Sequence, residues 1–354
     1  MNAGITLSID AMGGDNAPDM VIEGLELAHS RIPDAKFLVF GDEVRLNALI
    51  ERHPALAGCC EIRHAEGVIT NEMKPSVALR SGRKSSMWHA IAAVKSQEAD
   101  GIISAGNTGA LMAMSMIQLR TLPGVSRPAI ATYFPTQRGR SVMLDLGANV
   151  TCDAENLVQF AVMGEVFARQ VLDLEQPSVG ILNVGVEDLK GHEEVKQASA
   201  LLQEANLPIK FHGFVEGDDI GAGTVDVIVT DGFTGNVALK TAEGTARMFG
   251  LFLREALSAS LGSKLGALLA MPALKRFKQR VDPRRYNGAM FVGLNGICVK
   301  SHGGTDGLGF SNAIRASERL VRHGFNDRIK EDLERLMAQR EREEPSIAAE
   351  DTAK

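Results

Sequence analysis

The chain has 354 residues, a net charge of −6, 45% hydrophobic residues and only 5% aromatic residues. This length suits one large globular domain or two modest ones, and the composition excludes collagen-like and low-complexity chains. The negative charge and the shortage of aromatic side chains also exclude a globally basic nucleic-acid-binding protein and a base-stacking surface.

Strand-like and helix-like segments alternate along most of the chain. Continuous apolar runs predict strands at 5–10, 37–40, 101–104, 130–134, 142–146, 179–184, 209–215, 225–230 and 296–300. Helical periodicity predicts helices from about residue 18 and at 42–52, 77–95, 109–119, 155–172, 193–204 and 237–257. This alternation predicts an α/β fold with three layers, in which helices cover both faces of a mainly parallel sheet. We expect residues 1–335 to form one large domain and the charged segment 336–354 to be a disordered tail.

Several signatures of common enzyme classes are missing from the sequence. It contains no Gly-Lys pair of a P-loop, no G-x-G-x-x-G after the first strand, and no H-E-x-x-H or G-x-S-x-G motif. The four cysteines show neither zinc-type spacing nor a disulfide framework, so we expect reduced thiols and no bound metal; they are Cys59, Cys60, Cys152 and Cys298. The N-terminus leads directly into the strand at 5–10, and no run approaches about 20 apolar residues. We therefore expect a cytoplasmic protein without a transmembrane helix.

Polar loops that contain glycine follow several of the predicted strands. They span residues 10–16, 104–110, 145–149, 183–187, 230–236 and 300–304. Because open α/β sheets bind ligands outside the carboxyl ends of their strands, we expect these loops to line one shared site. The loop at 104–110 offers hydroxyl groups, an amide and backbone N–H groups at a helix start, which suits an anion. For each loop taken alone, a capped turn is the alternative.

Two ionisable side chains lie in the last of these loops. Lys300 can neutralise an anion, and His302 can move a proton near neutral pH. A salt-bridged lysine beside a surface histidine is the alternative interpretation of the same residues.

Two basic segments lie outside the strand-end loops. Arg80, Arg83 and Lys84 fall near the start of a predicted helix, where the helix dipole disfavours cations, so either an anionic partner or a solvated face explains them. Segment 264–285 combines seven Lys or Arg residues and one Asp with an apolar stripe. Its residues suit the surface of an anionic membrane; they include Leu265, Leu268, Leu269, Lys275, Arg276, Phe277 and Lys278. A dimer-forming helix pair is the alternative for this protruding amphipathic segment, which we expect to span 251–285.

Taken together, the motifs resemble the bacterial phosphate acyltransferases of phospholipid synthesis, the PlsX family. The resemblance runs from about residue 5 to 330 and rests on the segments 10–15, 74–87, 104–110, 145–149, 231–236 and 294–303. It implies transfer of a long-chain acyl group from acyl carrier protein to inorganic phosphate, giving an acyl phosphate that a membrane glycerol-3-phosphate acyltransferase consumes. It also implies a homodimer attached peripherally to the inner face of the cell membrane, with no redox cofactor. The implied fold is that of isocitrate and isopropylmalate dehydrogenases and of phosphotransacetylases.

The resemblance also suggests roles for individual residues. Phosphate is itself an anionic nucleophile, so direct attack on the thioester needs no catalytic Ser or Cys. We expect the phosphate to be held by Gly13, Gly14, Ser104, Gly106, Asn107 and Thr108, with Lys300 offsetting its charge. Asn236 or Asn149 would bind the oxyanion, and His302 would handle the proton. The carrier protein would dock on Arg80, Arg83 and Lys84.

Three other functions suit the same sequence. A phosphotransacetylase-like transacylase that uses CoA and a decarboxylating dehydrogenase both fit the expected architecture. The dehydrogenase would need a nicotinamide site and usually a divalent metal. A non-catalytic membrane-surface binding protein is the alternative outside the enzymes, but it would leave the strand-end loops without a role.

Overall fold

The computed structural model describes residues 4–205 and 209–335, so the predicted tail at 336–354 lies outside the described residues. The strands are β1 (Thr6–Asp10), β2 (Lys36–Gly41), β3 (Cys60–His64), β4 (Gly101–Ser104), β5 (Ala129–Thr136), β6 (Gly139–Leu144), β7 (Ser178–Leu182), β8 (Lys210–Val215), β9 (Val227–Val229), β10 (Ala289–Val292) and β11 (Ile297–Lys300). The α-helices are α1 (Asp19–His29), α2 (Glu43–Ile50), α3 (Pro75–Ser81), α4 (Ser86–Lys95), α5 (Thr108–Gln118), α6 (Ala154–Leu172), α7 (Glu193–Glu204), α8 (Gly217–Ala222), α9 (Gly232–Ser258), α10 (Leu261–Val281) and α11 (Gly307–Arg322).

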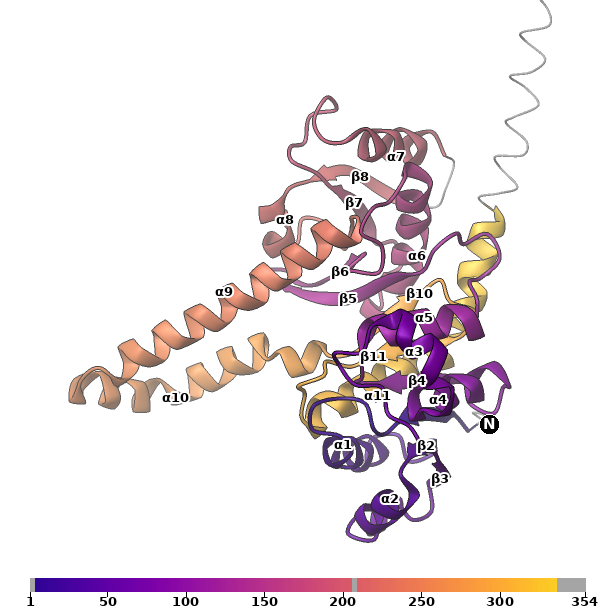
Figure 1. Ribbon diagram of the computed structural model, residues 1–354. Coiled ribbons are helices and arrows are strands. Elements are labelled where there is room, and N and C mark those ends of the chain that lie inside the picture. The colour runs from indigo at the N-terminus through magenta and orange to yellow at the C-terminus, as the bar shows by residue number, and fades with distance from the viewer. Residues whose placement is uncertain (1–3, 206–208, 336–354) are drawn as a thin grey trace, which may run out of the picture.

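Within the described residues, eleven strands form one sheet in the order β3-β2-β1-β4-β11-β10-β5-β6-β9-β7-β8 (Figure 1). Neighbouring strands run parallel except in the pairs β11–β10, β10–β5 and β5–β6. The predicted mainly parallel sheet is therefore confirmed. Because the direction reverses an odd number of times, β6, β9, β7 and β8 run opposite to β1, β2, β3, β4 and β11.

Helices cover both faces of this sheet. On one face α1, α6 and α11 pack against the strands in a core that includes Leu25 and Phe310. On the other face α4 and α5 pack in a second core that includes Ile91 and Met114. Burial of apolar area on both faces accounts for the continuous apolar runs in the central strands. The predicted three-layer α/β architecture is thus confirmed.

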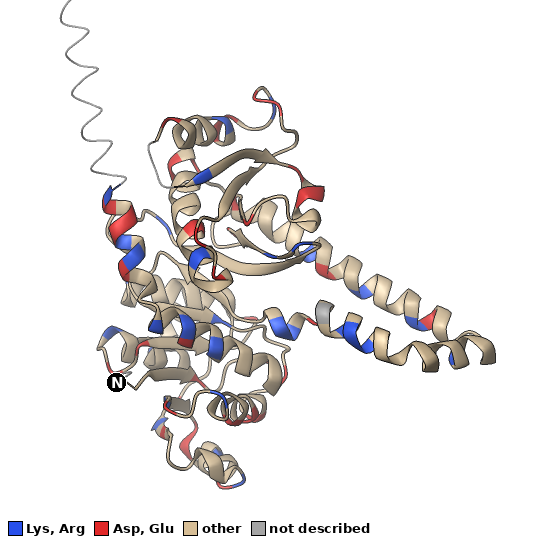
Figure 2. Cartoon of the chain, turned by 180° about the vertical axis from the view of Figure 1, so that it is seen from behind, with Lys and Arg blue, Asp and Glu red and all other residues tan. Residues whose placement is uncertain are grey.

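The helices α9 and α10 form a helical hairpin that projects away from the sheet (Figure 1). Its apolar residues Leu265, Leu268, Leu269 and Phe277 are between 56% and 78% exposed. The predicted cations Lys275, Arg276 and Lys278 are exposed on the same helix, and Figure 2 shows several basic residues along α10. The helical pair begins before the predicted segment 251–285, because α9 runs unbroken from Gly232.

No single helix among the described residues is long and apolar enough to cross a membrane. Only α9 and the helical segment from Leu261 to Tyr286, taken together with a bend of 118° between them, have the required length and composition.

Several elements differ from the predictions. The expected helix at 77–95 is two helices, α3 and α4, because a 3₁₀ turn at Gly82–Lys84 separates them. The Ser85 hydroxyl caps the start of α4 by accepting a hydrogen bond from the Trp88 N–H at 3.2 Å. A Cβ on Gly82 would lie 2.6 Å from Ile69 Cδ1, so the side chains around this turn would have to shift to admit a larger residue. The elements β3, β10 and α11 were not predicted.

Candidate active site

The carboxylate of Asp10 is the buried centre of the first group of strand-end loops. Asp10 ends β1, is 1% exposed, and accepts hydrogen bonds of 2.6 Å from the hydroxyl groups of Ser86 and Ser104. Burial raises the pKa of Asp10, while these two hydroxyl groups and the charge of Lys300 oppose that shift. We refer to Asp10, Ser86, Ser104 and Lys300 as the Asp10 cluster.

The glycines after β1 allow the loops to close around this carboxylate. A Cβ on Gly13 would lie 2.5 Å from Asp10 Oδ2 and 2.7 Å from the backbone nitrogen of Gly106. Gly14 has φ of +111°, a conformation that favours glycine. The predicted glycines Gly13, Gly14 and Gly106 therefore lie together beside Asp10 and Ser104, where they allow the backbones of the two loops to pack closely.

The hydrogen bonds of loop 104–110 correct part of the predicted phosphate cradle. The Ser104 hydroxyl donates to Asp10 and accepts from the Gly106 N–H at 3.0 Å. The Asn107 side chain caps α5 by accepting from the Ala110 N–H, and its Nδ2 donates to the backbone carbonyl oxygens of residues 70, 71 and 73. The loop is thus held together by Ser104, the Gly106 N–H and Asn107, so these groups do not present free hydrogen-bond donors to a phosphate. Thr108 is exposed at the start of α5 and is the predicted ligand best placed to contact an anion.

Lys300 ends β11 and directs its ammonium group into the same cluster. Its Nζ donates to the carbonyl oxygen of Ala105 at 3.2 Å and to that of Ser301. Burial lowers the pKa of Lys300 to about 8, while the negative charges of Asp10 and Asp15 oppose the shift. Lys300 is therefore mostly charged at pH 7 and loses its charge as the pH rises past about 8.

The predicted proton-transfer residue, His302, lies at the exposed rim of this cluster. Its Nδ1 accepts a hydrogen bond from the Gly304 N–H at 3.1 Å, which in the neutral ring assigns the proton to Nε2. A Cβ on Gly304 would lie 3.3 Å from Asp15 Oδ2 and 3.7 Å from His302 Cε1, so Asp15 and His302 are close neighbours. The Asp15 N–H donates to the Gly303 carbonyl at 2.9 Å and ties the two loops together.

A second buried carboxylate, that of Asp145, organises the loops after β6 and β9. It accepts from the backbone N–H groups of Ile130, Gly147, Ala148 and Asn149 at 2.7–3.2 Å. The Asn149 side chain uses its two N–H groups to donate to the Pro128 carbonyl at 2.8 Å and to Asp145 Oδ2 at 2.9 Å. Both N–H groups of Asn149 are therefore committed to the loop, which favours Asn236, the other predicted oxyanion donor.

Asn236 is the amide that is left for a ligand in this second group. It lies exposed on the first turns of α9, and a Cβ on Gly147 would lie 3.6 Å from its Cβ. Among the described residues, the Asn236 side chain has no hydrogen-bond partner. The helix start approaches the Asp145 loop closely, since a Cβ on Gly235 would lie 1.9 Å from the Asp145 carbonyl oxygen. We refer to Asp145, Asn149 and Asn236 as the Asp145 cluster.

The two clusters follow strands that run in opposite directions. Loops after β1, β4 and β11 leave one edge of the sheet, whereas loops after β6, β9 and β7 follow strands of the opposite direction. The two groups of loops therefore leave the sheet at opposite edges. The helix α9 connects the clusters nonetheless, because Lys240, one turn beyond Asn236, lies close enough to affect the charge of Lys300.

The remaining basic residues lie on the surface beside the Asp10 cluster. Arg80, Arg83 and Lys84 are all exposed, on α3 and the 3₁₀ turn that precedes α4. Lys84 forms an ion pair with Glu66 at 2.8 Å, and the Arg83 guanidinium lies 5.8 Å from the centre of the Trp88 ring. This leaves Arg80 and Arg83 as the cations that are not paired with a carboxylate within the described residues.

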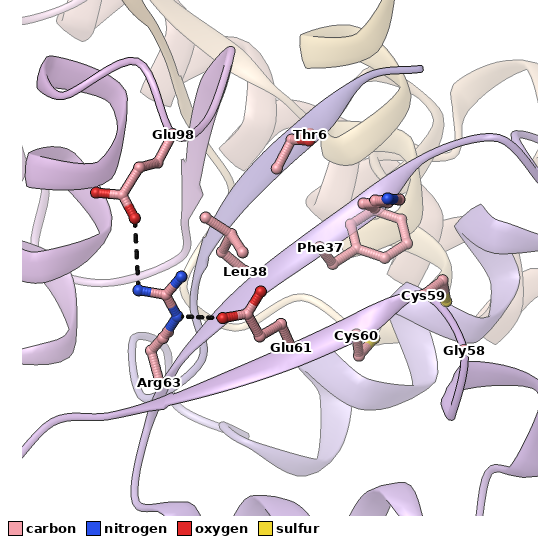
Figure 3. Close-up of a pocket in the computed structure, with 10 residues that line it drawn as sticks. Thr6, Phe37, Leu38, Gly58, Cys59, Cys60, Glu61, Arg63 and Glu98 are labelled. Atoms are coloured by element: carbon pink, nitrogen blue, oxygen red, sulfur yellow. Dashed lines mark hydrogen bonds and ion pairs between the residues drawn. The ribbon is translucent and has the colours of Figure 1, made fainter.

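A cavity in the described residues lies away from both clusters. It has a volume of about 410 Å³ and lies at the amino ends of β1, β2 and β3, the edge opposite to Asp10 (Figure 3). Arg63 lines it and bridges Glu61 at 2.5 Å and Glu98 at 3.4 Å. Burial raises the pKa values of the neighbouring Cys59 and Cys60 thiols, so neither is an activated nucleophile. Within 4–205 and 209–335 there is also no group of three His, Cys, Asp or Glu residues placed to hold a metal ion.

Sequence reasoning missed the two carboxylates that organise the site. The sequence places Asp10 and Asp145 in strand-end loops, but it shows neither that their carboxylates are buried nor that Ser86 bonds Asp10. The available signal was an Asp at the end of an apolar strand, followed within four residues by glycine. Buried carboxylates need several donors, and glycine-rich loops supply them as backbone N–H groups.

Three comparisons with known proteins bear on the chain as a whole. The profile of a family described as "Fatty acid synthesis protein" matches residues 5–328. A phosphate acyltransferase of Paramagnetospirillum magneticum and one of Rhodospirillum rubrum are each 60% identical over 336 residues, covering 95% of this chain and 96% of the relative. A solved phosphotransacetylase from Streptococcus pyogenes has a similar fold, with a TM-score of 0.60 at 14% identity, covering 91% of this chain and 95% of that chain.

Proposed function

The chain belongs to the fatty acid synthesis protein family and is an acyltransferase, and we propose that it transfers a long-chain acyl group from acyl carrier protein to inorganic phosphate. The observation that carries this proposal is the 60% identity to phosphate acyltransferases over nearly the full length of both chains. The Asp10 and Asp145 clusters provide the chemistry that such a transfer needs.

The reaction balances without a covalent enzyme intermediate. A phosphate oxygen forms a bond to the thioester carbonyl carbon, and the carbonyl oxygen becomes an oxyanion. The C–S bond then breaks, the acyl phosphate forms, and the thiolate leaves and takes up a proton. Holding phosphate and thioester together is the main task of the protein, and positioning of this kind can lower a barrier by about 7–11 kcal/mol.

We assign the phosphate to the space beside Lys300 and Thr108. The Lys300 ammonium offsets the phosphate charge, and the N-terminus of α5 adds a favourable dipole at Thr108. Gly13, Gly14, Ser104, Gly106 and Asn107 support this space by holding the loops close together. In this arrangement the departing thiolate takes up a proton from solvent at the exposed rim, and the Nε2–H of His302, the free side of its ring, donates a hydrogen bond to the leaving sulfur.

The oxyanion of the tetrahedral intermediate is assigned to Asn236. Its amide has no partner among the described residues, and it lies on the helix that also places Lys240 near Lys300. A single preorganised donor of this kind contributes about 3 kcal/mol to transition-state stabilisation.

Two surfaces would serve the proposed partners. The exposed cations Arg80 and Arg83 lie next to the Asp10 cluster and suit an acidic carrier protein, with Lys84 held in an ion pair at their edge. The helical hairpin exposes an apolar stripe together with Lys275, Arg276 and Lys278, which suits an anionic lipid surface. We therefore propose a cytoplasmic homodimer, peripherally attached to the inner face of the membrane, whose acyl phosphate passes to a glycerol-3-phosphate acyltransferase there.

The proposal is tested by phosphate-dependent release of free thiol from palmitoyl-carrier protein, measured alongside palmitoyl-CoA. We expect thiol release to require phosphate and to be faster with the carrier protein. Faster release from CoA would instead support a CoA-dependent transacylase. Absence of phosphate-dependent release from either donor would support a non-catalytic binding protein.

A further inference from the structure

We propose that Asp10 is a positioning residue, which acts on the phosphate substrate through its neighbours Ser104 and Lys300 in the Asp10 cluster; this inference rests on the proposed function. Asp10 lies in a loop whose glycines suit an anion, yet an exposed carboxylate there would repel phosphate. The geometry of the Asp10 cluster resolves this conflict, because the carboxylate is buried and faces the hydroxyl groups of Ser86 and Ser104.

The sheet register places the two charged groups on either side of one serine. Asp10 on β1 pairs with Ser104 on β4, and Ser104 pairs with Lys300 on β11. Residues in register on neighbouring parallel strands share a face of the sheet, and adjacent strands are about 4.8 Å apart. The backbones of Asp10 and Lys300 are thus separated by two strand spacings, about 10 Å, with the Ser104 side chain between them.

The Asp10 carboxylate cannot touch substrate, so we expect it to act through Lys300. One carboxylate oxygen accepts from Ser86 and the other accepts from Ser104, both at 2.6 Å. The side chain is 1% exposed, and Gly13 and Gly106 pack directly over it. A buried carboxylate with both oxygens occupied is out of reach of substrate, but a charge at this position still acts on Lys300 because burial weakens solvent screening.

The charge state of Lys300 is decided by a small set of neighbours. Burial and the like charge of Lys240 on α9 favour the neutral amine. Asp10 on β1, Asp15 in the following loop and the Cys298 thiol on β11 favour the ammonium, and Asp10 is the strongest of these three. Removal of the Asp10 charge therefore takes away the main group that keeps Lys300 protonated at neutral pH.

The pH dependence of the reaction reports this coupling. In the wild-type protein, kcat/KM for phosphate should fall above about pH 8, where Lys300 loses its proton. Asp10→Asn should move this alkaline limb about one pH unit lower, which corresponds to a roughly threefold loss at pH 7.5. Asp15→Asn is the matched control, because it removes a weaker and more exposed charge and should move the limb less. Lys300→Arg should abolish the limb, since a guanidinium stays charged throughout this range.

A second readout does not depend on activity. Competitive labelling of amines with acetic anhydride, followed by mass spectrometry, gives the protonation midpoint of Lys300 directly. We expect a midpoint near pH 8 in the wild type. The midpoint should be lower in Asp10→Asn, and added phosphate should slow labelling of the wild type. Where Asp10→Asn fails to fold, Asp10→Ser removes the same charge with a smaller side chain.

The outcomes separate this inference from the proposed function. A folded Asp10 variant with the wild-type alkaline limb and labelling midpoint would overturn the positioning role, even if the enzyme transfers acyl groups to phosphate. Loss of stability alone, with both midpoints unchanged, would assign Asp10 to folding and also overturn it. A wild-type protein with no phosphate-dependent thiol release would refute the proposed function, while the labelling midpoint would still test whether Asp10 controls Lys300.

Discussion

Replacement of Asn236 should lower activity without changing stability, whereas replacement of Asn149 should lower stability. Asn236→Ala removes an exposed amide that has no partner among the described residues, so folding should be unaffected. If this amide binds the oxyanion, kcat should fall about 100- to 1,000-fold, equivalent to about 2.7–4 kcal/mol. Asn149→Ala instead removes donors at 2.8 Å to the Pro128 carbonyl and at 2.9 Å to Asp145 Oδ2. Each buried acceptor left short of a donor costs about 1–3 kcal/mol, so the variant should lose about 3 kcal/mol of stability.

These effects are separated by measuring kcat and Tm on the same preparations. We expect Asn236→Ala to keep the wild-type Tm and lose activity, and Asn149→Ala to melt about 5 °C lower. Asn236→Asp is a useful control, because it keeps the size of the side chain but removes its N–H donors. The assignment is refuted if Asn149→Ala loses turnover at an unchanged Tm while Asn236→Ala keeps the wild-type kcat.

Three further predictions concern the surfaces and the core. Replacement of both Arg80 and Arg83 by Glu should raise KM for the acyl-carrier protein about tenfold at low salt and leave KM for acyl-CoA unchanged. An equal effect on both donors would argue against docking of the carrier protein at these residues. Leu268→Glu with Leu269→Glu should reduce flotation with anionic vesicles, whereas undiminished flotation would exclude this segment as the anchor. Burial raises the pKa of Glu165 from 4.5 to about 7, so the folded protein holds this proton more tightly and its contribution to stability falls as pH rises through that window. Glu165→Gln should therefore flatten the Tm profile between those pH values, and an unchanged profile would contradict the assignment.

The fold could be predicted from the sequence where burial is two-sided and periodicity is strong. The predicted helix at 193–204 coincides with α7, and that at 155–172 starts one residue after the first residue of α6. Edge strand β3 was missed because it is half-exposed and carries charged residues, so it lacks a continuous apolar run. Strand β10 has only four residues, which is too short for a hydrophobic pattern to reveal it. It runs antiparallel to its neighbours and is one reason why the two clusters follow strands of opposite direction.

The candidate site could be predicted only as a set of loops. Residue types identified Lys300, Asn236 and Thr108, which the structure leaves in positions to meet a ligand. They did not distinguish these residues from Ser104, Asn107 and Asn149, whose polar atoms are used within the loops. That distinction depends on hydrogen bonds between segments far apart in the chain, such as those from Asn107 to residues 70–73, and no local pattern encodes them.

The central claim is that phosphate itself attacks the thioester. It is tested most directly by incubating the enzyme with palmitoyl-carrier protein and phosphate, then measuring free thiol and acyl phosphate in the same sample. Hydroxylamine converts acyl phosphate to a hydroxamate that can be counted against the thiol. The account predicts one acyl phosphate for each thiol released, and no thiol release without phosphate. Thiol release at the same rate without phosphate, with free fatty acid as the product, would contradict it.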